Sequence, residues 1–155
     1  QLILTMLIIQ LVAIGGAYIF ARLSKLIGNK YSLAVMIILW VIICFAAYFV
    51  RSATHFYLLA FLVGLVMGGI QSLSRATYSK LIPDDTLDHT SYFSFYDVTE
   101  KISIVIGTIV YGIIIQITGG MRLSSVALSL FFIAGLVVLL RTRIPHQKAE
   151  VKQSI

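Results

Sequence analysis

Long apolar runs dominate the chain, and only short polar segments separate them. The runs extend from about Leu2 to Phe20, from Tyr31 to Val50, from Phe56 to about Tyr78, from about Tyr92 to Ile117, and from Leu123 to Leu140. Each is close to the roughly 20 residues that an α-helix needs to cross about 30 Å of hydrocarbon. Strands of an outer-membrane barrel would be half as long and would alternate strictly. The pattern therefore predicts an all-α, polytopic transmembrane helix bundle of five spans.

The composition supports the same class of protein. Hydrophobic residues make up 59% of the 155 residues, charged residues make up 12%, and the mean hydropathy is +0.99. A soluble domain of this size has too little interior to bury so many apolar side chains. A lipid bilayer must therefore surround much of the chain.

The basic residues sort by membrane side. One side carries Arg22, Lys25, Lys30, Arg75, Lys80, Arg141, Arg143, Lys148 and Lys152, and the other carries Arg51 and Arg122. The positive-inside rule makes the first side cytoplasmic. The sequence thus predicts a transmembrane domain at 1–141 and a basic cytoplasmic tail at 142–155. Because the net charge of +6 forms no single basic face, no nucleic-acid partner is expected.

The chain reads as the C-terminal part of a longer protein. Five spans, an external start and a first residue of Gln imply a missing N-terminal half as partner. The segment from Gln1 to Phe20 has no basic start and is long enough to span, so no signal peptide is identified there. The lone Cys44 can form no internal disulfide.

The spans differ in polarity, which predicts their positions in the bundle. The spans at 31–50 and 123–140 contain no charge, so both can meet lipid all round and are expected to be outer helices. The other three carry polar and small residues and are expected to lie inside.

Helix packing is assigned to Gly64, Gly68, Gly69 and Gly107, the first two in a small-xxx-small pattern. Gln71 and Arg75 share one face, where Arg75 either lines a polar cavity or snorkels to the headgroups.

The span at 92–117 carries a polar stripe. Asp97, Glu100 and Lys101 lie within one arc that continues to Thr108 and Tyr111. Each charge near a bilayer centre costs on the order of 2.5 to 3.5 kcal/mol, so the stripe should face protein or water. Asp97 and Lys101 have the spacing of an intrahelical ion pair, which leaves Glu100 to bind a proton or a cation. The alternative is a structural ion pair whose third member snorkels toward the interface.

Two stretches carry a family resemblance. They are Gly68-Gly69-Ile70-Gln71-Ser72-Leu73-Ser74-Arg75 with Lys80-Leu81-Ile82-Pro83, and Phe93-Ser94-Phe95-Tyr96-Asp97-Val98-Thr99-Glu100-Lys101. They resemble the vacuole-effluxer-like branch of the major facilitator superfamily, including bacterial members, over roughly residues 56 to 141. The resemblance implies that the five spans are helices eight to twelve of a twelve-helix fold. The segment at 21–30 looks like the superfamily's basic cytoplasmic loop, with Arg22, Lys25, Gly28 and Lys30 but without its acidic residue.

The chain also departs from that family's pattern. Ser94 stands where Gly is usual, Thr108 where Pro is usual, and Glu100 where a small or polar residue is more typical. Glu100 is therefore interpreted as an individual feature of this chain. The loop at 83–85 is more acidic than expected, which would alter gating contacts.

The resemblance implies a secondary active transporter that moves a small polar solute by alternating access, with an amino acid as one candidate. Such a protein needs no cofactor and would lie in a bacterial plasma membrane. Asp97, Glu100 and Lys101 would form the pathway, with proton coupling through Glu100. Contacts to solute or gate are assigned to Gln71, Arg75, Tyr96, Thr108, Tyr111 and Gln10.

Two other classes of function were weighed. Intramembrane aspartyl proteases need a second Asp in a Gly-x-Gly-Asp setting, which the sequence lacks, and His55, His89 and His146 are scattered. Neither catalysis nor metal binding is expected. A non-transporting membrane scaffold or channel subunit stays open, because the polar stripe could serve helix assembly alone.

Overall fold

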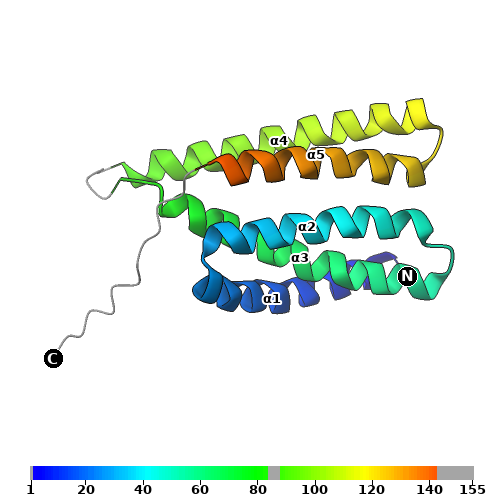
Figure 1. Ribbon diagram of the computed structural model, residues 1–155, viewed down its shortest axis with the longest axis horizontal. Helices are drawn as coiled ribbons and strands as arrows, with labels where there is room; N and C mark the ends of the chain where they lie inside the picture. The colour runs from blue at the N-terminus through cyan, green and yellow to red at the C-terminus, as the bar shows by residue number, and fades with distance from the viewer. Residues whose placement is uncertain (1, 84–87, 143–155) are drawn as a thin grey trace.

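The computed structural model describes residues 2–83 and 88–142, and these form a bundle of long helices (Figure 1). The helices are α1 (Leu2–Ile27), α2 (Asn29–Phe49), α3 (Ala53–Ser79), α4 (His89–Thr118) and α5 (Met121–Arg141). All five are long and apolar enough to cross a membrane. The predicted fold class, a polytopic helix bundle, is confirmed.

The first helix is longer than its apolar run, which corrects the loop expected at 21–30. Helix α1 continues through Arg22 and Lys25 to Ile27, and Gly28 alone separates it from α2. Basic side chains with long stems are good helix formers, so they need not end a helix. Gly28 has φ 86°, a backbone conformation that other residues rarely adopt, and it therefore makes the sharp reversal.

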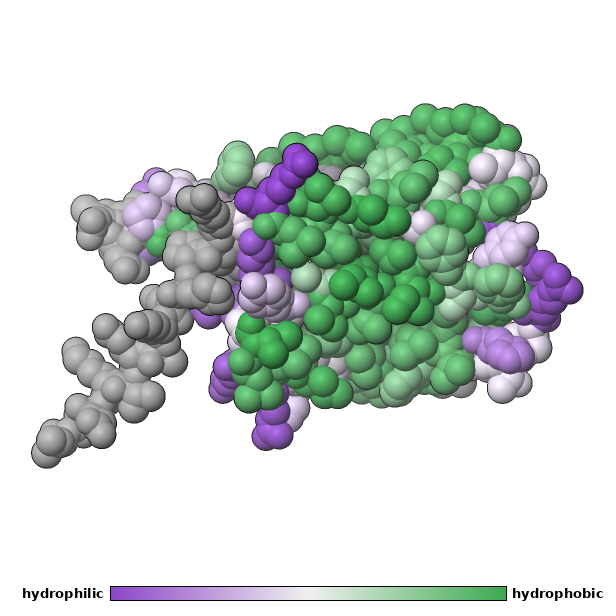
Figure 2. Space-filling view, in the orientation of Figure 1, coloured by the Kyte–Doolittle hydropathy of each residue, from purple (hydrophilic) through white to green (hydrophobic). Residues whose placement is uncertain are grey.

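The short links make successive helices run in opposite directions, so the bundle has two ends (Figure 1). The Gly28 end contains the last turns of α1, α3 and α5 and the first turns of α2 and α4, and the Arg51 end contains the others. Lys25, Lys30, Lys80 and Arg141 lie at the Gly28 end, and Arg122 lies at the Arg51 end. On the face drawn in Figure 2, hydrophilic residues gather at the two ends and a hydrophobic belt lies between them. Arg143, Lys148, Lys152 and most of the predicted tail lie outside the described residues.

Helices α1 and α3 make the closest backbone contact of the bundle. A Cβ atom built on Gly64 would lie 2.8 Å from the carbonyl oxygen of Ile9. On Gly68 it would overlap the backbone of Ala13, and on Gly16 it would overlap the backbone of Leu65. The absence of side chains at these glycines is therefore what lets the two helices touch.

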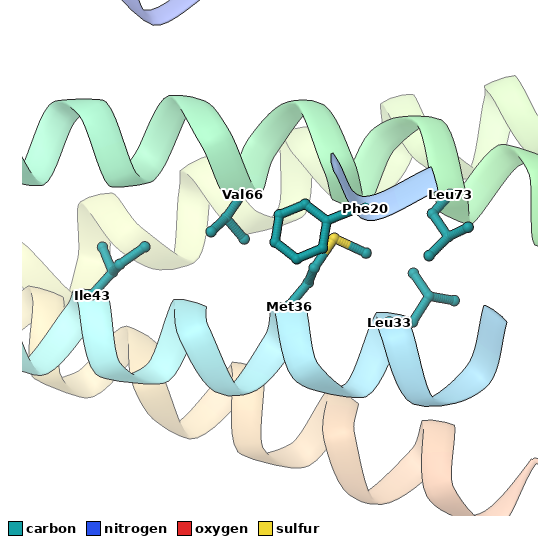
Figure 3. Packing of buried hydrophobic residues seen from close by; sticks show 6 residues of the cluster. All are labelled: Phe20, Leu33, Met36, Ile43, Val66 and Leu73. Carbon is teal, nitrogen blue, oxygen red and sulfur yellow. The ribbon is translucent and has the colours of Figure 1, made fainter. Parts of the chain in front are cut away.

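The hydrophobic core joins α1, α2 and α3 (Figure 3). Its buried members are Phe20 from α1, Leu33, Met36 and Ile43 from α2, and Val66 and Leu73 from α3. A Cβ atom on Gly69 would lie 2.9 Å from the sulfur of Met36, so this glycine makes room for the core.

Helix α2 is more enclosed than its sequence predicts. It packs against α3 on one side and α5 on the other, where Trp40 stacks on Phe132 with ring centroids 5.3 Å apart. Ser32 and Met36 are fully buried. The span at 31–50 therefore does not meet lipid all round, although Ile38 and Ile42 on its other face are exposed. An uncharged sequence allows contact with lipid, but it equally allows burial between helices.

Helix α4 is the least enclosed of the five. It packs along α5, and none of its residues is buried in the described chain. Ile102, Val105, Ile106 and Ile109 are all more than half exposed. Helix α4 approaches α3 through side chains at the Gly28 end, and the candidate site lies there.

Candidate functional site

An open groove of about 520 Å³ lies between α3 and α4. Helix α3 contributes Ile70, Gln71, Ser72, Ser74 and Arg75, and helix α4 contributes Tyr96, Glu100 and Lys101. Gln71, Ser74 and Arg75 recur at spacings of three and four residues and share one face of α3, and Tyr96 and Glu100, four residues apart, share one face of α4. The groove thus brings together Gln71, Arg75, Tyr96, Glu100 and Lys101 from the sequence-based candidates.

The ion pair at this groove differs from the predicted one. The guanidinium of Arg75 pairs with the carboxylate of Asp97, across the gap between α3 and α4. The intrahelical partner expected for Asp97, Lys101, lines the groove instead. The Arg75 and Asp97 side chains are 55% and 51% exposed, so the described helices enclose only about half of each. The pair is therefore an accessible link between two helices.

Tyr96 is held beside this ion pair by two contacts. Its hydroxyl donates to the Ser74 hydroxyl over 3.1 Å, and the Arg75 guanidinium lies over its ring, 5.6 Å from the centroid. Sequence reasoning missed Ser74. Its position three residues after Gln71 and one before Arg75 could have placed it on the same face.

A second set of contacts, which the sequence analysis also missed, closes the Gly28 end of the groove. The Tyr78 hydroxyl donates to the carbonyl oxygen of Tyr92 over 3.0 Å. The Tyr78 ring lies 5.0 Å from the Tyr96 ring and 6.4 Å from the Phe93 ring, measured between centroids. We call Tyr78, Phe93 and Tyr96 the aromatic clasp. It joins the last turn of α3 to the first turns of α4.

The groove combines both signs of charge with neutral hydrogen-bonding groups. Of the lining residues, Arg75 and Lys101 are cationic, Glu100 is acidic, and Gln71 supplies an amide. Asp97 adds a second acid beside the groove through its pair with Arg75. Glu100 is half-buried, whereas Lys101 is exposed. Such a lining can bind a small solute that carries opposite charges, or one with several hydrogen-bonding groups.

Four of the predicted pathway and solute residues are not among those that line the groove: Asp97, which pairs with Arg75 beside it, Thr108, Tyr111 and Gln10. The Thr108 hydroxyl donates to the Ile104 carbonyl oxygen of its own helix over 2.8 Å. Tyr111 is half-buried further along α4, and Gln10 is exposed on α1. A Cβ atom on Gly107 would meet nothing within 4 Å in the described chain, unlike those on the α3 glycines.

The predicted basic segment forms contacts at the Gly28 end rather than a free loop. The Lys30 ammonium donates to the carbonyl oxygens of Leu140 and Thr142, each over 2.8 Å, and so caps the last turn of α5. The Asn29 amide donates to the Thr77 hydroxyl over 3.1 Å, and Lys80 donates to the Asn29 side chain over 3.4 Å. The start of α2 therefore holds the ends of both α3 and α5.

Metal binding finds no support in the described part of the chain, where no three His, Cys, Asp or Glu side chains cluster closely enough to hold an ion.

The fold and groove define a class: an α-helical integral membrane protein with a polar site between helices near one end of the bundle. Within that class, the chain belongs to the vacuole effluxer Atg22-like family, whose model matches residues 1–152. The resemblance predicted from the sequence is confirmed.

Individual relatives agree with this assignment. The chain is 31% identical over 139 residues to an uncharacterized MFS-type transporter, YxiO, of Bacillus subtilis, an alignment covering 90% of this chain and 32% of that protein. It is 33% identical over 97 residues to autophagy-related protein 22 of Eremothecium gossypii, covering 63% of this chain and 19% of that protein. The autophagy-related protein 22 of Cryptococcus neoformans is 33% identical over 100 residues, an alignment covering 64% of this chain and 17% of that protein. The chain spans about a third or less of the length of these relatives. No solved structure matches.

Proposed function

We propose that the chain is the C-terminal part of a secondary active transporter, and that the groove between α3 and α4 forms part of its solute pathway. The observation that carries this proposal is the convergence of five candidate polar residues on one groove beside an interhelical ion pair. Polar groups at membrane depth are retained where they face protein or water, and in transporters they mark pathways. The MFS-type relative supports the same function.

The Arg75–Asp97 pair would act as a switch at the Gly28 end. A solute with a carboxylate can compete with Asp97 for Arg75, because a guanidinium binds any carboxylate in the same forked geometry. Loss of the pair would leave the aromatic clasp and the Tyr96–Ser74 hydrogen bond as side-chain links between α3 and the first turns of α4. Alternating access would then include separation of these two helices. A small polar solute such as an amino acid fits the mixed charge of the groove.

Glu100 is the proposed proton carrier. It lies eleven residues into α4, about 16 Å along the helix axis, and it lines the groove beside Lys101. A half-buried carboxylate on a groove can bind a proton from one side of the membrane and release it to the other. Because Asp97 is already paired with Arg75, Glu100 is the acid that is left for this task.

We further propose that the Gly28 end faces the cytoplasm, with residues 142–155 as a basic tail, and that the protein lies in a bacterial plasma membrane. The charge distribution between the two ends and the Bacillus relative support this orientation and location.

Uptake by the full-length protein in proteoliposomes tests the proposal. A panel of labelled amino acids should reveal a solute whose uptake depends on an inward proton gradient. Glu100→Gln should keep the protein folded but flatten the dependence of uptake on pH, whereas Glu100→Asp should preserve that dependence. A Glu100→Gln protein with an unchanged pH profile would exclude the proton role. Absence of flux for every polar solute tried would favour the scaffold or channel alternative.

A further inference from the structure

One face of α1 changes from apolar to aromatic to basic along its length. Leu7, Leu11, Ile14, Tyr18, Arg22 and Lys25 recur at spacings of three and four residues. At 100° per residue they occupy an arc of about 80°. Leu11 and Ile14 are each 70% exposed and Tyr18 is 59% exposed, and both cations are exposed as well. We call these six residues the α1 stripe.

The two cations of the stripe have no acid near them on the surrounding helices. Helices α1, α2, α3 and α5 contain no Asp or Glu at all. The acids described in the structure are Asp88, Asp97 and Glu100, all at or within α4, which packs on α5 and not on α1. The positive charge of the stripe is therefore not neutralised by the helices that pack against α1.

The Arg22 side chain is held in place rather than extended into water. Its guanidinium lies over the Tyr18 ring, 4.5 Å from the centroid. Side chains on a helix lean toward its N-terminus, so Arg22 is directed back toward the apolar part of the stripe. Stacking on a ring leaves the N–H edge of a guanidinium free to bind an anion.

We propose that the α1 stripe binds an anionic phospholipid, with its phosphate on Arg22 and Lys25 and an acyl chain along Leu7, Leu11 and Ile14. The distance from Leu7 to Tyr18 is eleven residues, about 16 Å of helix, which matches one leaflet of a hydrocarbon core of about 30 Å. Tyr18 would then lie at the membrane–water interface, where aromatic residues are enriched. A Cβ atom on Gly15 would meet nothing within 4 Å among the described residues, so these leave the helix surface beside Ile14 open to an acyl chain. A soluble anion would use the two cations but not the apolar residues.

Native mass spectrometry of the full-length protein tests this site, with phosphatidylglycerol compared against phosphatidylcholine carrying the same acyl chains. The double variant Arg22→Gln with Lys25→Gln should bind phosphatidylglycerol more weakly, by roughly fivefold for each charge and so about 25-fold in total. The matched control, Lys80→Gln with Arg141→Gln, removes two charges at the same end of the bundle that do not belong to the stripe. Its affinity should change much less. Equal losses in the two double variants would overturn the proposal.

A second measurement covers the case in which the stripe variant does not fold. A phosphatidylglycerol with a photoreactive acyl chain should label peptides containing Leu11 and Ile14 in the unaltered protein. High salt should reduce this labelling, because exposed charges are screened. Crosslinks from these positions to other parts of the protein, with no labelling by lipid, would show that the protein itself covers the stripe and would overturn the proposal.

Discussion

The ion pair between Arg75 and Asp97 gives the sharpest prediction at the scale of single residues. Because both side chains are about half exposed, the pair should contribute only about 0.2–1 kcal/mol to stability. Loss of the pair should affect transport much more than it affects stability. We expect Arg75→Asp to abolish uptake with a small change in thermal stability. The reversed pair, Arg75→Asp with Asp97→Arg, should restore part of the uptake.

The matched control exchanges the two residues that the sequence alone would pair. The double variant Asp97→Lys with Lys101→Asp keeps the intrahelical spacing but leaves Arg75 beside a lysine. This protein should therefore lack uptake. Rescue by this exchange, and not by the one across the helices, would assign the functional pair to α4 alone.

Asp88 gives a pH-dependent prediction. Hydrogen bonds from Ser91 lower the pKa of Asp88 below its ordinary value of 3.8, since they stabilise the charged carboxylate. A lowered pKa in the folded state means that the stabilisation is present above pH 3.8 and is lost as the pH falls through the folded-state pKa. The first turn of α4 should therefore loosen in acid. Hydrogen exchange of residues 89–92, corrected for intrinsic rates, measures this change.

The control for this effect is Asp88→Asn. An Asn side chain caps a helix about as well as Asp, but it does not titrate. Exchange in this variant should be independent of pH in the same range. Equal acid sensitivity in both proteins would place the titrating group elsewhere.

At this scale, the identity of the site residues was more predictable than their pairing. Helical spacing alone indicated that Asp97, Glu100 and Lys101 share a face and that Gln71 and Arg75 share another. Which base meets Asp97 depends on how α3 and α4 approach each other in space. Lys101 is within reach along the helix and Arg75 is within reach across the groove, so the sequence could not decide between them.

At the scale of helices, the glycines of the α1–α3 contact differ sharply in what surrounds them. A methyl group on Gly68 would overlap the backbone of Ala13, which cannot move aside as a flexible side chain can. We expect Gly68→Ala to destabilise the protein by about 1–3 kcal/mol, as overpacking does. Gly15→Ala is the control, because its methyl group would enter open space and should stabilise the helix by about 0.5–1 kcal/mol. Thermal unfolding in a fixed detergent compares the two, and destabilisation of similar size in both would argue against the close contact.

The helices themselves were predictable, and their ends less so. Continuous apolar runs of about 20 residues indicate spans almost regardless of detail. The end of α1 was misplaced because Arg22 and Lys25 are polar without breaking a helix, whereas Gly28 does break it. Polarity marks where a segment leaves the bilayer, and backbone conformation marks where a helix ends.

At the scale of the whole molecule, the assignment of inner and outer helices stays a prediction, because the chain spans about a third or less of the length of its relatives. Lack of charge predicts an outer α2, which in the described chain packs between α3 and α5. Charge in α4 predicts an inner helix, which in the described chain packs along α5 with none of its residues buried. The polarity of a helix face indicates which surroundings it can contact, lipid, water or protein. It does not indicate which other helices pack against that face.

The contacts at the Gly28 end divide the bundle into a firmly joined part and a loosely joined one. Asn29 and Lys30 connect the start of α2 to the ends of α3 and α5. Helix α4 meets α3 through the exposed Arg75–Asp97 pair and the aromatic clasp. If α3 and α4 separate during transport, as proposed, the start of α4 should move while the ends of α2 and α5 stay together.

Spin-label distances in the full-length protein measure this difference, in a background free of other cysteines in which Cys44 is replaced by Ser. Labels at positions 79 and 91 report on α3 and α4, and labels at positions 31 and 141 report on α2 and α5. We expect the first pair to show two populations whose ratio changes when solute is added, and the second pair to show one. Lys30→Met removes both hydrogen bonds to the last turn of α5, so it should broaden the second distribution and leave the first unchanged. A solute-dependent shift in the second pair alone would mean that the hinge lies between α2 and α5, because the Lys30 contacts would then be the ones that open.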